Sequence, residues 1–159
     1  MDSLAVGRCD RGMTTTAITT TTVVLGATGK TGRRVAARLR ARGLDVRPAS
    51  RSSAVRFDWT DRATWAPALD GAGAVYVSYQ PDLAVPGAPE AVAELAAIAA
   101  AAGAQRLVLL SGRGEEEAQR AERAVRDAFP AATIVRASWF AQNFSESFLA
   151  DLVRDGELA

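Results

Sequence analysis

Short, uninterrupted apolar runs alternate with helix-forming segments along most of this chain. The runs that we expect to be strands are residues 23–25, 44–49, 54–57, 74–78, 106–110 and 133–135. The segments that we expect to be helices are residues 29–42, 62–69, 90–102, 115–129 and 142–154. Continuous apolar runs are typical of parallel strands that are buried on both faces. The pattern therefore predicts an α/β fold: a doubly wound parallel sheet of about six strands, with helices on both faces.

The N-terminal segment does not follow this pattern, because it is rich in threonine and offers no apolar face to a core. We expect residues 1–21 to form a disordered Thr-rich tail and residues 22–159 to form one domain. A chain of 159 residues has the length of a single domain.

Composition excludes several kinds of site. The chain has no His and a single Cys, Cys9, which excludes a Ser-His-Asp triad, a His-ligated metal and an internal disulfide. The net charge of +1 gives no pull toward nucleic acid. The longest apolar run, residues 95–102, is too short to span a bilayer. We expect a cytoplasmic protein that has neither a nucleic-acid nor a membrane partner.

The first expected strand runs into the turn Gly26-Ala27-Thr28-Gly29-Lys30-Thr31-Gly32, and a helix follows. In such a Gly-x-x-Gly-x-x-Gly turn, Gly26 permits the tight turn, Gly29 the approach of a phosphate, and Gly32 the close packing of helix on sheet. The free N–H groups of the helix N-terminus would bind a pyrophosphate. The turn therefore predicts a Rossmann-type, dinucleotide-binding domain, and a glycine-rich turn without a ligand is the alternative. A Walker A loop is excluded because position 24, where that motif needs Gly, is Val.

The end of the second expected strand indicates which dinucleotide binds. An NAD site places Asp or Glu there to bind the ribose 2′-hydroxyl, but this chain has Arg51 among serines. A guanidinium suits the 2′-phosphate of NADP. We therefore expect NADP(H) in preference to NAD(H), and the alternative is a solvated surface arginine.

The glycine turn and several other segments resemble the NmrA-like group of atypical short-chain dehydrogenases/reductases. The similar segments include Ser50-Arg51, Phe57-Asp58-Trp59, Leu109-Leu110-Ser111 and residues 135–144. The Phe-Asp-Trp segment and the strand at residues 75–78 also resemble the ergot-alkaloid-type reductases of that group. The resemblance covers residues 23–158 and implies NADP(H) binding. The group holds both reductases of quinones or iminium-type substrates and non-enzymatic NADP-sensing regulators, so either activity is implied.

The resemblance also implies roles for individual residues. The pyrophosphate would be held by Gly26, Thr28, Gly29, Lys30, Thr31 and Gly32. The adenosine half would meet Arg51 at its 2′-phosphate and Asp58 and Trp59 beside its adenine. The groove where the strand order reverses would be lined by Ser78 and Tyr79, with Ser111 near the nicotinamide ribose and Trp139 and Phe140 facing the nicotinamide. The three aromatic residues Trp59, Trp139 and Phe140 could instead pack in the core, and Asp58 could be a turn residue.

The helix expected at residues 115–129 lacks the Tyr-x-x-x-Lys pair that short-chain dehydrogenases usually carry there. A Tyr-Lys alcohol dehydrogenase mechanism is thereby excluded, but hydride transfer to a quinone or an iminium carbon does not require that pair. We interpret the charges of this helix, including the pairs Glu116–Arg120 and Glu122–Arg126, as a solvated face.

The family pattern continues beyond residue 159 with a small C-terminal lobe that closes the substrate pocket. We expect that this substrate lobe is missing from the chain, and that the face it would cover leads to self-association or low solubility. Three functions are open: an NADPH-dependent reductase of a small-molecule electrophile, a redox sensor that binds a regulatory protein, and an inactive fragment.

Overall fold

The computed structural model describes residues 20–138, 140–146 and 148–157. Six strands form one parallel sheet in the order β3-β2-β1-β4-β5-β6. The strands are β1 (Thr22–Leu25), β2 (Val46–Ser50), β3 (Val55–Arg56), β4 (Ala74–Val77), β5 (Arg106–Gly112) and β6 (Thr133–Ala137). This order is the doubly wound Rossmann topology, so the predicted fold class is confirmed.

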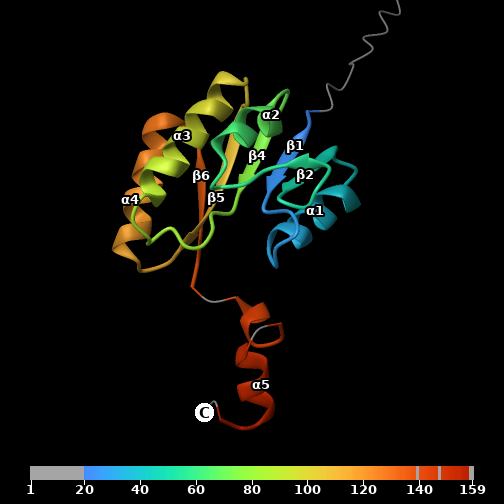
Figure 1. Cartoon of the computed structure of the whole chain (residues 1–159), viewed down its shortest axis with the longest axis vertical. Helices are drawn as coiled ribbons and strands as arrows, with labels where there is room; N and C mark the ends of the chain where they lie inside the picture. Colours follow the sequence, from blue (N-terminus) through green and yellow to red (C-terminus); the bar gives the residue numbers. More distant parts are fainter. Residues whose placement is uncertain (1–19, 139, 147, 158–159) are drawn as a thin grey trace, which may run out of the picture.

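The helices cover the two faces of the sheet unequally. They are α1 (Gly32–Ala41), α2 (Trp65–Leu69), α3 (Ala88–Ala101), α4 (Glu116–Ala128) and α5 (Phe148–Arg154), with 3-10 turns η1 (Arg62–Thr64) and η2 (Ala141–Asn143). In Figure 1, α3 and α4 pack side by side on one side of the sheet, whereas α1 lies on the other side. Helix α5 lies beyond the carboxyl end of β6, apart from the sheet (Figure 1).

The core lies mainly between the sheet and the helices α2, α3 and α4. Its largest fully buried side chains include Trp65, Leu69, Leu95, Leu107 and Leu109. A smaller cluster joins Val24, Ala27 and Ala36 beneath α1. Burial consequently alternates along β5, where Leu107 and Leu109 are buried but Val108 and Leu110 are only partly buried.

Several boundaries differ from those expected. The helix expected at residues 29–42 begins at Gly32, because residues 26–31 form the turn that follows β1. The single helix expected at residues 142–154 is divided into η2 and α5. Strands β5 and β6 run on to Gly112 and Ala137, because they pair in register to these residues.

Most of the expected tail, residues 1–19, lies outside the described residues. Thr21, which we assigned to the tail, belongs to the folded domain. Its carbonyl oxygen accepts hydrogen bonds from the backbone N–H groups of Gly73 (3.0 Å) and Ala74 (3.3 Å), and its hydroxyl donates to Asp45. These bonds extend the fold by one residue before β1.

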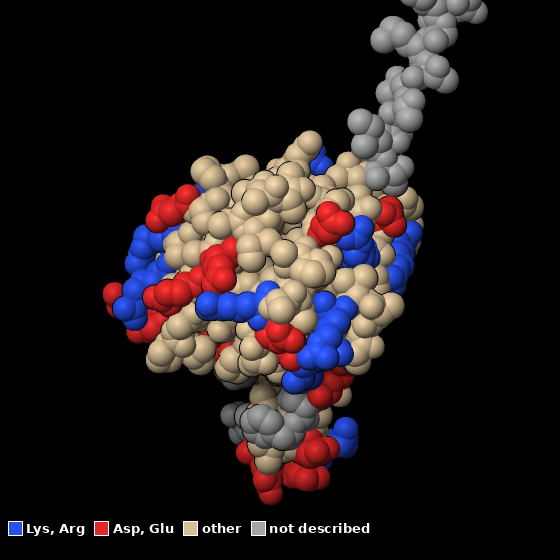
Figure 2. Space-filling view, turned by 45° about the horizontal axis from the view of Figure 1, so that its top comes forward, with Lys and Arg blue, Asp and Glu red and all other residues tan. Residues whose placement is uncertain are grey.

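The surface carries charges of both signs. Figure 2 shows Lys and Arg side chains interspersed with Asp and Glu over the face in view. In the part of the chain that the structure describes, no helix is both long enough and apolar enough to cross a membrane.

Candidate functional site

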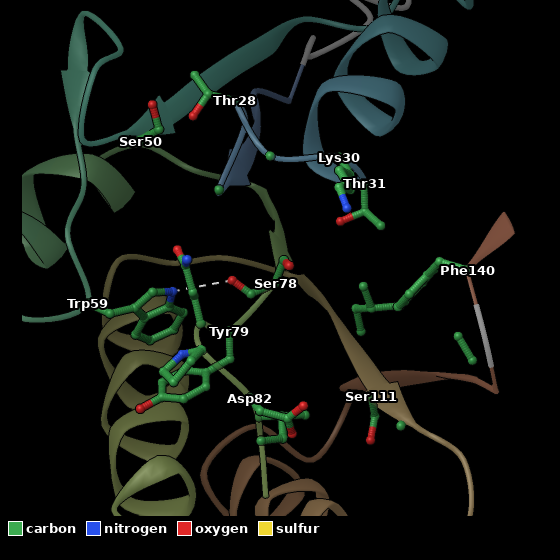
Figure 3. A pocket seen from close by; sticks show the side chains of 18 of the residues that line it. Thr28, Lys30, Thr31, Ser50, Trp59, Ser78, Tyr79, Asp82, Ser111 and Phe140 are labelled. Atoms are coloured by element: carbon green, nitrogen blue, oxygen red, sulfur yellow. Dashed lines mark hydrogen bonds between the residues drawn. The ribbon is translucent and has the colours of Figure 1, made fainter. Parts of the chain in front are cut away.

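A cleft of about 1220 Å³ lies at the carboxyl ends of the strands. It is at the point where the chain leaves β1 and β4 toward opposite faces, the place where open α/β sheets bind their ligands. Figure 3 shows its lining side chains. The predicted site residues that line it are Gly26, Thr28, Gly29, Lys30, Thr31, Arg51, Asp58, Trp59, Ser78, Tyr79, Ser111 and Phe140. Trp139 lies outside the described residues.

The loop between β1 and α1 is built for close approach of backbone. Gly26 has a φ of 68°, and its carbonyl oxygen accepts the N–H of Gly29 at 2.9 Å. A Cβ on Gly32 would lie 2.2 Å from the same oxygen, so the loop and the first turn of α1 leave no room for a side chain. Gly32 therefore packs beneath the loop and does not line the cleft. Its place matches the packing role that the motif assigns to the third glycine.

The N-terminus of α1 suits an anion. Its first turn contains no acidic residue, so no side chain of that turn cancels the positive end of the helix dipole. In Figure 3, Lys30 and Thr31 lie together at this helix end, and Thr28 lies nearer to Ser50. The Tyr76 phenol beneath the loop has a raised pKa because it is buried, an effect that a hydrogen bond with Thr31 partly offsets.

Arg51 projects from a tight turn at the end of β2. Ser50 is 5% exposed, its Oγ lies 2.7 Å from Ser53 Oγ, and it accepts the N–H of Ser52 at 3.3 Å. This bonding fixes the turn, while Arg51 is exposed and makes no ion pair with any described residue. The turn thus leaves an exposed guanidinium at the carboxyl end of β2, on the lining of the cleft.

Asp58 follows β3 and shapes the same end of the cleft. Its Oδ1 accepts the N–H of Thr60 at 3.0 Å and the hydroxyl of Thr60 at 2.9 Å. These two bonds, helped by the positive charges of Arg51 and Arg56, lower the pKa of Asp58. Asp58 is therefore a turn residue and also a lining residue.

Trp59 belongs both to the core and to the cleft. Its Nε1 donates to the carbonyl oxygen of Ser78 at 3.2 Å (Figure 3). Its ring lies edge-on to Phe57, Trp65 and Tyr79, with centroid distances of 5.0, 5.4 and 4.7 Å. Aromatic packing holds the ring as a rigid wall between the ends of β3 and β4.

Ser111, at the other end of the cleft, is tied to a buried carboxylate. It is 4% exposed, and its hydroxyl donates to Glu122 Oε1 at 2.7 Å. Because an ionised carboxylate only accepts, the Ser111 proton is directed toward α4. The remaining hydrogen-bonding capacity of Ser111 is that of an acceptor.

The interpretation of Glu122 as part of a solvated face is wrong. Glu122 is 1% exposed, and its carboxylate accepts hydrogen bonds from Arg136 at 2.6 and 2.9 Å, whereas Arg126 is 3.9 Å away. Glu122 lies on the buried face of α4, together with small apolar residues, and its partner Arg136 lies on β6. The hydrogen bonds from Arg136 lower the pKa of Glu122 against the opposing effect of burial. Arg120 pairs with Glu117 at 3.4 Å instead of with Glu116.

Sequence reasoning gave no site role to several other lining residues: Thr60, Gln80, Asp82, Glu115, Ser138 and Asn143. All of them lie in segments that follow a strand. Their position beyond the carboxyl ends of parallel strands was a usable signal, but it does not tell which loop residues face the cleft.

A family model described as NAD(P)H-binding matches residues 26–153. No match was found among curated proteins. A short-chain dehydrogenase/reductase superfamily protein from Agrobacterium tumefaciens with bound NAD is similar in structure, with a TM-score of 0.61 and 22% identity over 82% of this chain. A Rossmann-fold NAD(P)-binding family protein from Shigella flexneri gives a TM-score of 0.63 and 22% identity over 76% of this chain and 68% of its own length.

Triphenylmethane reductase from Citrobacter sp., complexed with NADP(H), gives a TM-score of 0.57 and 17% identity over 86% of this chain. The chain spans 54% of the Agrobacterium protein and 55% of the Citrobacter reductase. These likenesses agree with the Rossmann fold. The crowded glycine loop and the acid-free helix N-terminus fit a dinucleotide pyrophosphate. The chain thus belongs to the NAD(P)H-binding family, and it shares its fold with solved NAD(P)-binding proteins, among them the Agrobacterium short-chain dehydrogenase/reductase superfamily protein.

Proposed function

We propose that the chain is the cofactor-binding part of an NADPH-dependent reductase, which delivers hydride to a quinone or to the carbon of an iminium-type molecule. The observation that carries this proposal is the continuous cleft that runs from the glycine loop and Arg51 to Ser111 and Phe140. Its first end suits a phosphorylated adenosine, and its second end leaves polar and aromatic groups for a reacting pair.

The preference for NADP(H) rests on Arg51. The guanidinium is exposed, is not engaged in an ion pair with any described residue, and lies in a turn whose other residues are serines. No carboxylate ends β2, so the ribose 2′-hydroxyl of NAD would lack its usual acceptor.

The bound cofactor would supply the hydride, and the residues of this chain would bind and orient the reactants. The loop of Gly26 and Gly29 would hold the pyrophosphate, and the ring of Trp59 would line the cleft beside the adenine. Ser111 would offer only an acceptor to the cleft, because its proton is donated to Glu122. Since α4 contains neither Tyr nor Lys, a suitable acceptor is one that needs hydride alone or that takes its protons from water.

A non-enzymatic NADP redox sensor that binds a regulatory protein is the second candidate. The same missing Tyr-Lys pair favours it, because cofactor binding would then require no proton donor. The two candidates make the same prediction for cofactor binding and differ only in turnover.

Isothermal titration of NADPH and NADH against the wild type and Arg51→Ala tests the cofactor site. We expect the variant to lose about 1–3 kcal/mol of NADPH binding, because charge-assisted hydrogen bonds contribute that much, and NADH binding to stay unchanged. Arg62→Ala is the matched control, because Arg62 is exposed and pairs with Glu94 away from the cleft. Equal losses for NADPH and NADH would contradict the assignment of Arg51 to the 2′-phosphate.

Turnover is tested by NADPH oxidation with a panel of quinones and iminium ions. A reductase consumes NADPH in the presence of at least one acceptor. NADPH binding without any turnover would contradict the reductase and would leave the sensor or an inactive fragment.

A further inference from the structure

The charges that line the cleft are separated along its length. Among the described lining residues, the charged ones are Lys30, Arg51, Asp58, Asp82 and Glu115. Both cations lie at the phosphate and adenosine end, and Asp58 lies close enough to Arg51 for that charge to lower its pKa. Asp82 and Glu115 come from the segments that follow β4 and β5, at the end where the acceptor would bind.

Asp82 is held at that end by its own loop. It follows β4, and its Oδ1 accepts the N–H of Ala84 at 2.9 Å, which leaves Oδ2 without a bond to any described residue. Figure 3 shows Asp82 and Ser111 at the end of the cleft that is remote from Thr28 and Ser50.

Glu115 lies against the end of β5. A Cβ built on Gly112 would be 2.5 Å from Glu115 Oε2 and 3.0 Å from Oε1, so the carboxylate covers the backbone beside Ser111. Neither Glu115 nor Asp82 forms an ion pair with any described residue. Two carboxylates without an ion pair to any described residue therefore border the end of the cleft where the acceptor would bind.

The charges of the acceptor and the cofactor before and after hydride transfer determine which acceptor the two carboxylates favour. In reduction of an iminium ion, a C–H bond of the reduced cofactor breaks and a C–H bond forms on the acceptor carbon. The acceptor gains two electrons and becomes a neutral amine, while the cofactor takes over the positive charge. One positive charge thus stays near the carboxylates throughout. Reduction of a neutral quinone instead forms a hydroquinone anion while the cofactor becomes positive, so the reacting pair carries no net charge for the carboxylates to attract. The anion also forms at the end of the cleft that the two carboxylates border, until water supplies a proton, and like charges repel.

We propose that Asp82 and Glu115 make the site selective for cationic hydride acceptors, such as iminium ions, over neutral quinones. This inference rests on the proposed reductase function, because it narrows the substrate class of the same cleft. The two carboxylates act as specificity-determining groups by attracting the cation and by disfavouring an anionic product.

The kinetic test compares the wild type, Asp82→Asn, Glu115→Gln and the double variant, at saturating NADPH. The acceptors are the cation N-methyl-3,4-dihydroisoquinolinium and the neutral quinone menadione. Each substitution should lower kcat/KM for the cation by roughly 3- to 10-fold, mainly through KM, because a partly solvated charge a few ångströms away contributes about 1 kcal/mol. The rate with menadione should stay equal or rise. Added salt should weaken the preference of the wild type.

The substituted side chains keep their shape, and the amide oxygen introduced by Asp82→Asn can still accept the N–H of Ala84. Glu116→Gln is the matched control, because Glu116 is an exposed neighbour of Glu115 that does not line the cleft. Turnover that is equally affected for both acceptors, or unaffected for the cation, would overturn the inference while leaving the reductase function in place.

Binding of probes that cannot be reduced tests charge selection without requiring that the chain be an active reductase. Trimethylanilinium and tert-butylbenzene have the same shape and differ in charge, and neither can be reduced at its quaternary centre. With NADP+ bound, the wild type should prefer the cation, and the double variant should lose that preference. Equal affinities of the wild type for the two probes would refute charge selection even if no acceptor turns over.

Discussion

Replacing Arg136 by leucine tests how much the stability of the fold depends on the ion pair between Arg136 and the buried Glu122. Three contacts join the two side chains, at 2.6, 2.9 and 3.1 Å between guanidinium nitrogens and carboxylate oxygens. After the substitution, Glu122 keeps only the hydroxyl of Ser111 and the distant guanidinium of Arg126 at 3.9 Å. A carboxylate that is 1% exposed would then lack its main partner.

The expected loss in the free energy of unfolding follows from how deeply each of the two paired side chains is buried. Removing one partner of a fully buried ion pair costs about 3–5 kcal/mol. The Arg136 side chain is 47% exposed, so water can enter beside Glu122 and the pair is partly screened. We therefore expect the free energy of unfolding to fall by about 2–3 kcal/mol, or roughly 4–12 °C in Tm for a domain of this size.

Urea unfolding at neutral pH measures this loss, with Arg120→Leu as the control. Arg120 lies on the exposed face of α4 and pairs with Glu117 at 3.4 Å, so its removal should cost less than about 0.5 kcal/mol. The double variant Glu122→Leu/Arg136→Leu should recover most of the loss, because it leaves no buried charge.

The loss should also depend on pH. The pairing holds the pKa of Glu122 below its ordinary value of 4.5, so it stabilises the fold above that pH and ceases to do so as the pH falls through the lowered pKa. The difference between the wild type and Arg136→Leu should therefore shrink in acid. A variant no less stable than Arg120→Leu at neutral pH, or a difference that grows in acid, would refute this reasoning.

Two further predictions concern the loop and its neighbour. Gly32→Ala would place a methyl group 2.2 Å from the carbonyl oxygen of Gly26, so unfolding in urea should show a loss of about 1–3 kcal/mol, and wild-type stability would contradict the crowding. Glu146 forms ion pairs with Arg33 and Arg34 at the start of α1, and these pairs lower its pKa. Glu146→Gln should therefore lower the free energy of unfolding only slightly at neutral pH, and the loss should disappear in high salt or as the pH falls below 4.5, the ordinary pKa of the group. A loss that persists in high salt would show that packing, and not charge, holds this contact.

The sequence alone predicted those features that depend on neighbours along the chain. The apolar runs, the helices between them and the glycine turn are each encoded within a few residues, so the α/β order and the position of the phosphate loop could be predicted. The rule that relates the end of the second strand to the ribose also pointed to Arg51, which lines the cleft; its contact with a 2′-phosphate stays a prediction.

Tertiary structure decided the features that depend on residues far apart in the chain. Glu122 and Arg126 are spaced as a helical pair, yet β6 places Arg136 closer, and no local pattern tells which face of α4 turns inward. Asp82 and Glu115 come from separate loops, and they line the same cleft because β4 and β5 lie side by side. The field at the acceptor end is a sum over such groups, so it exists only once the sheet has brought them together.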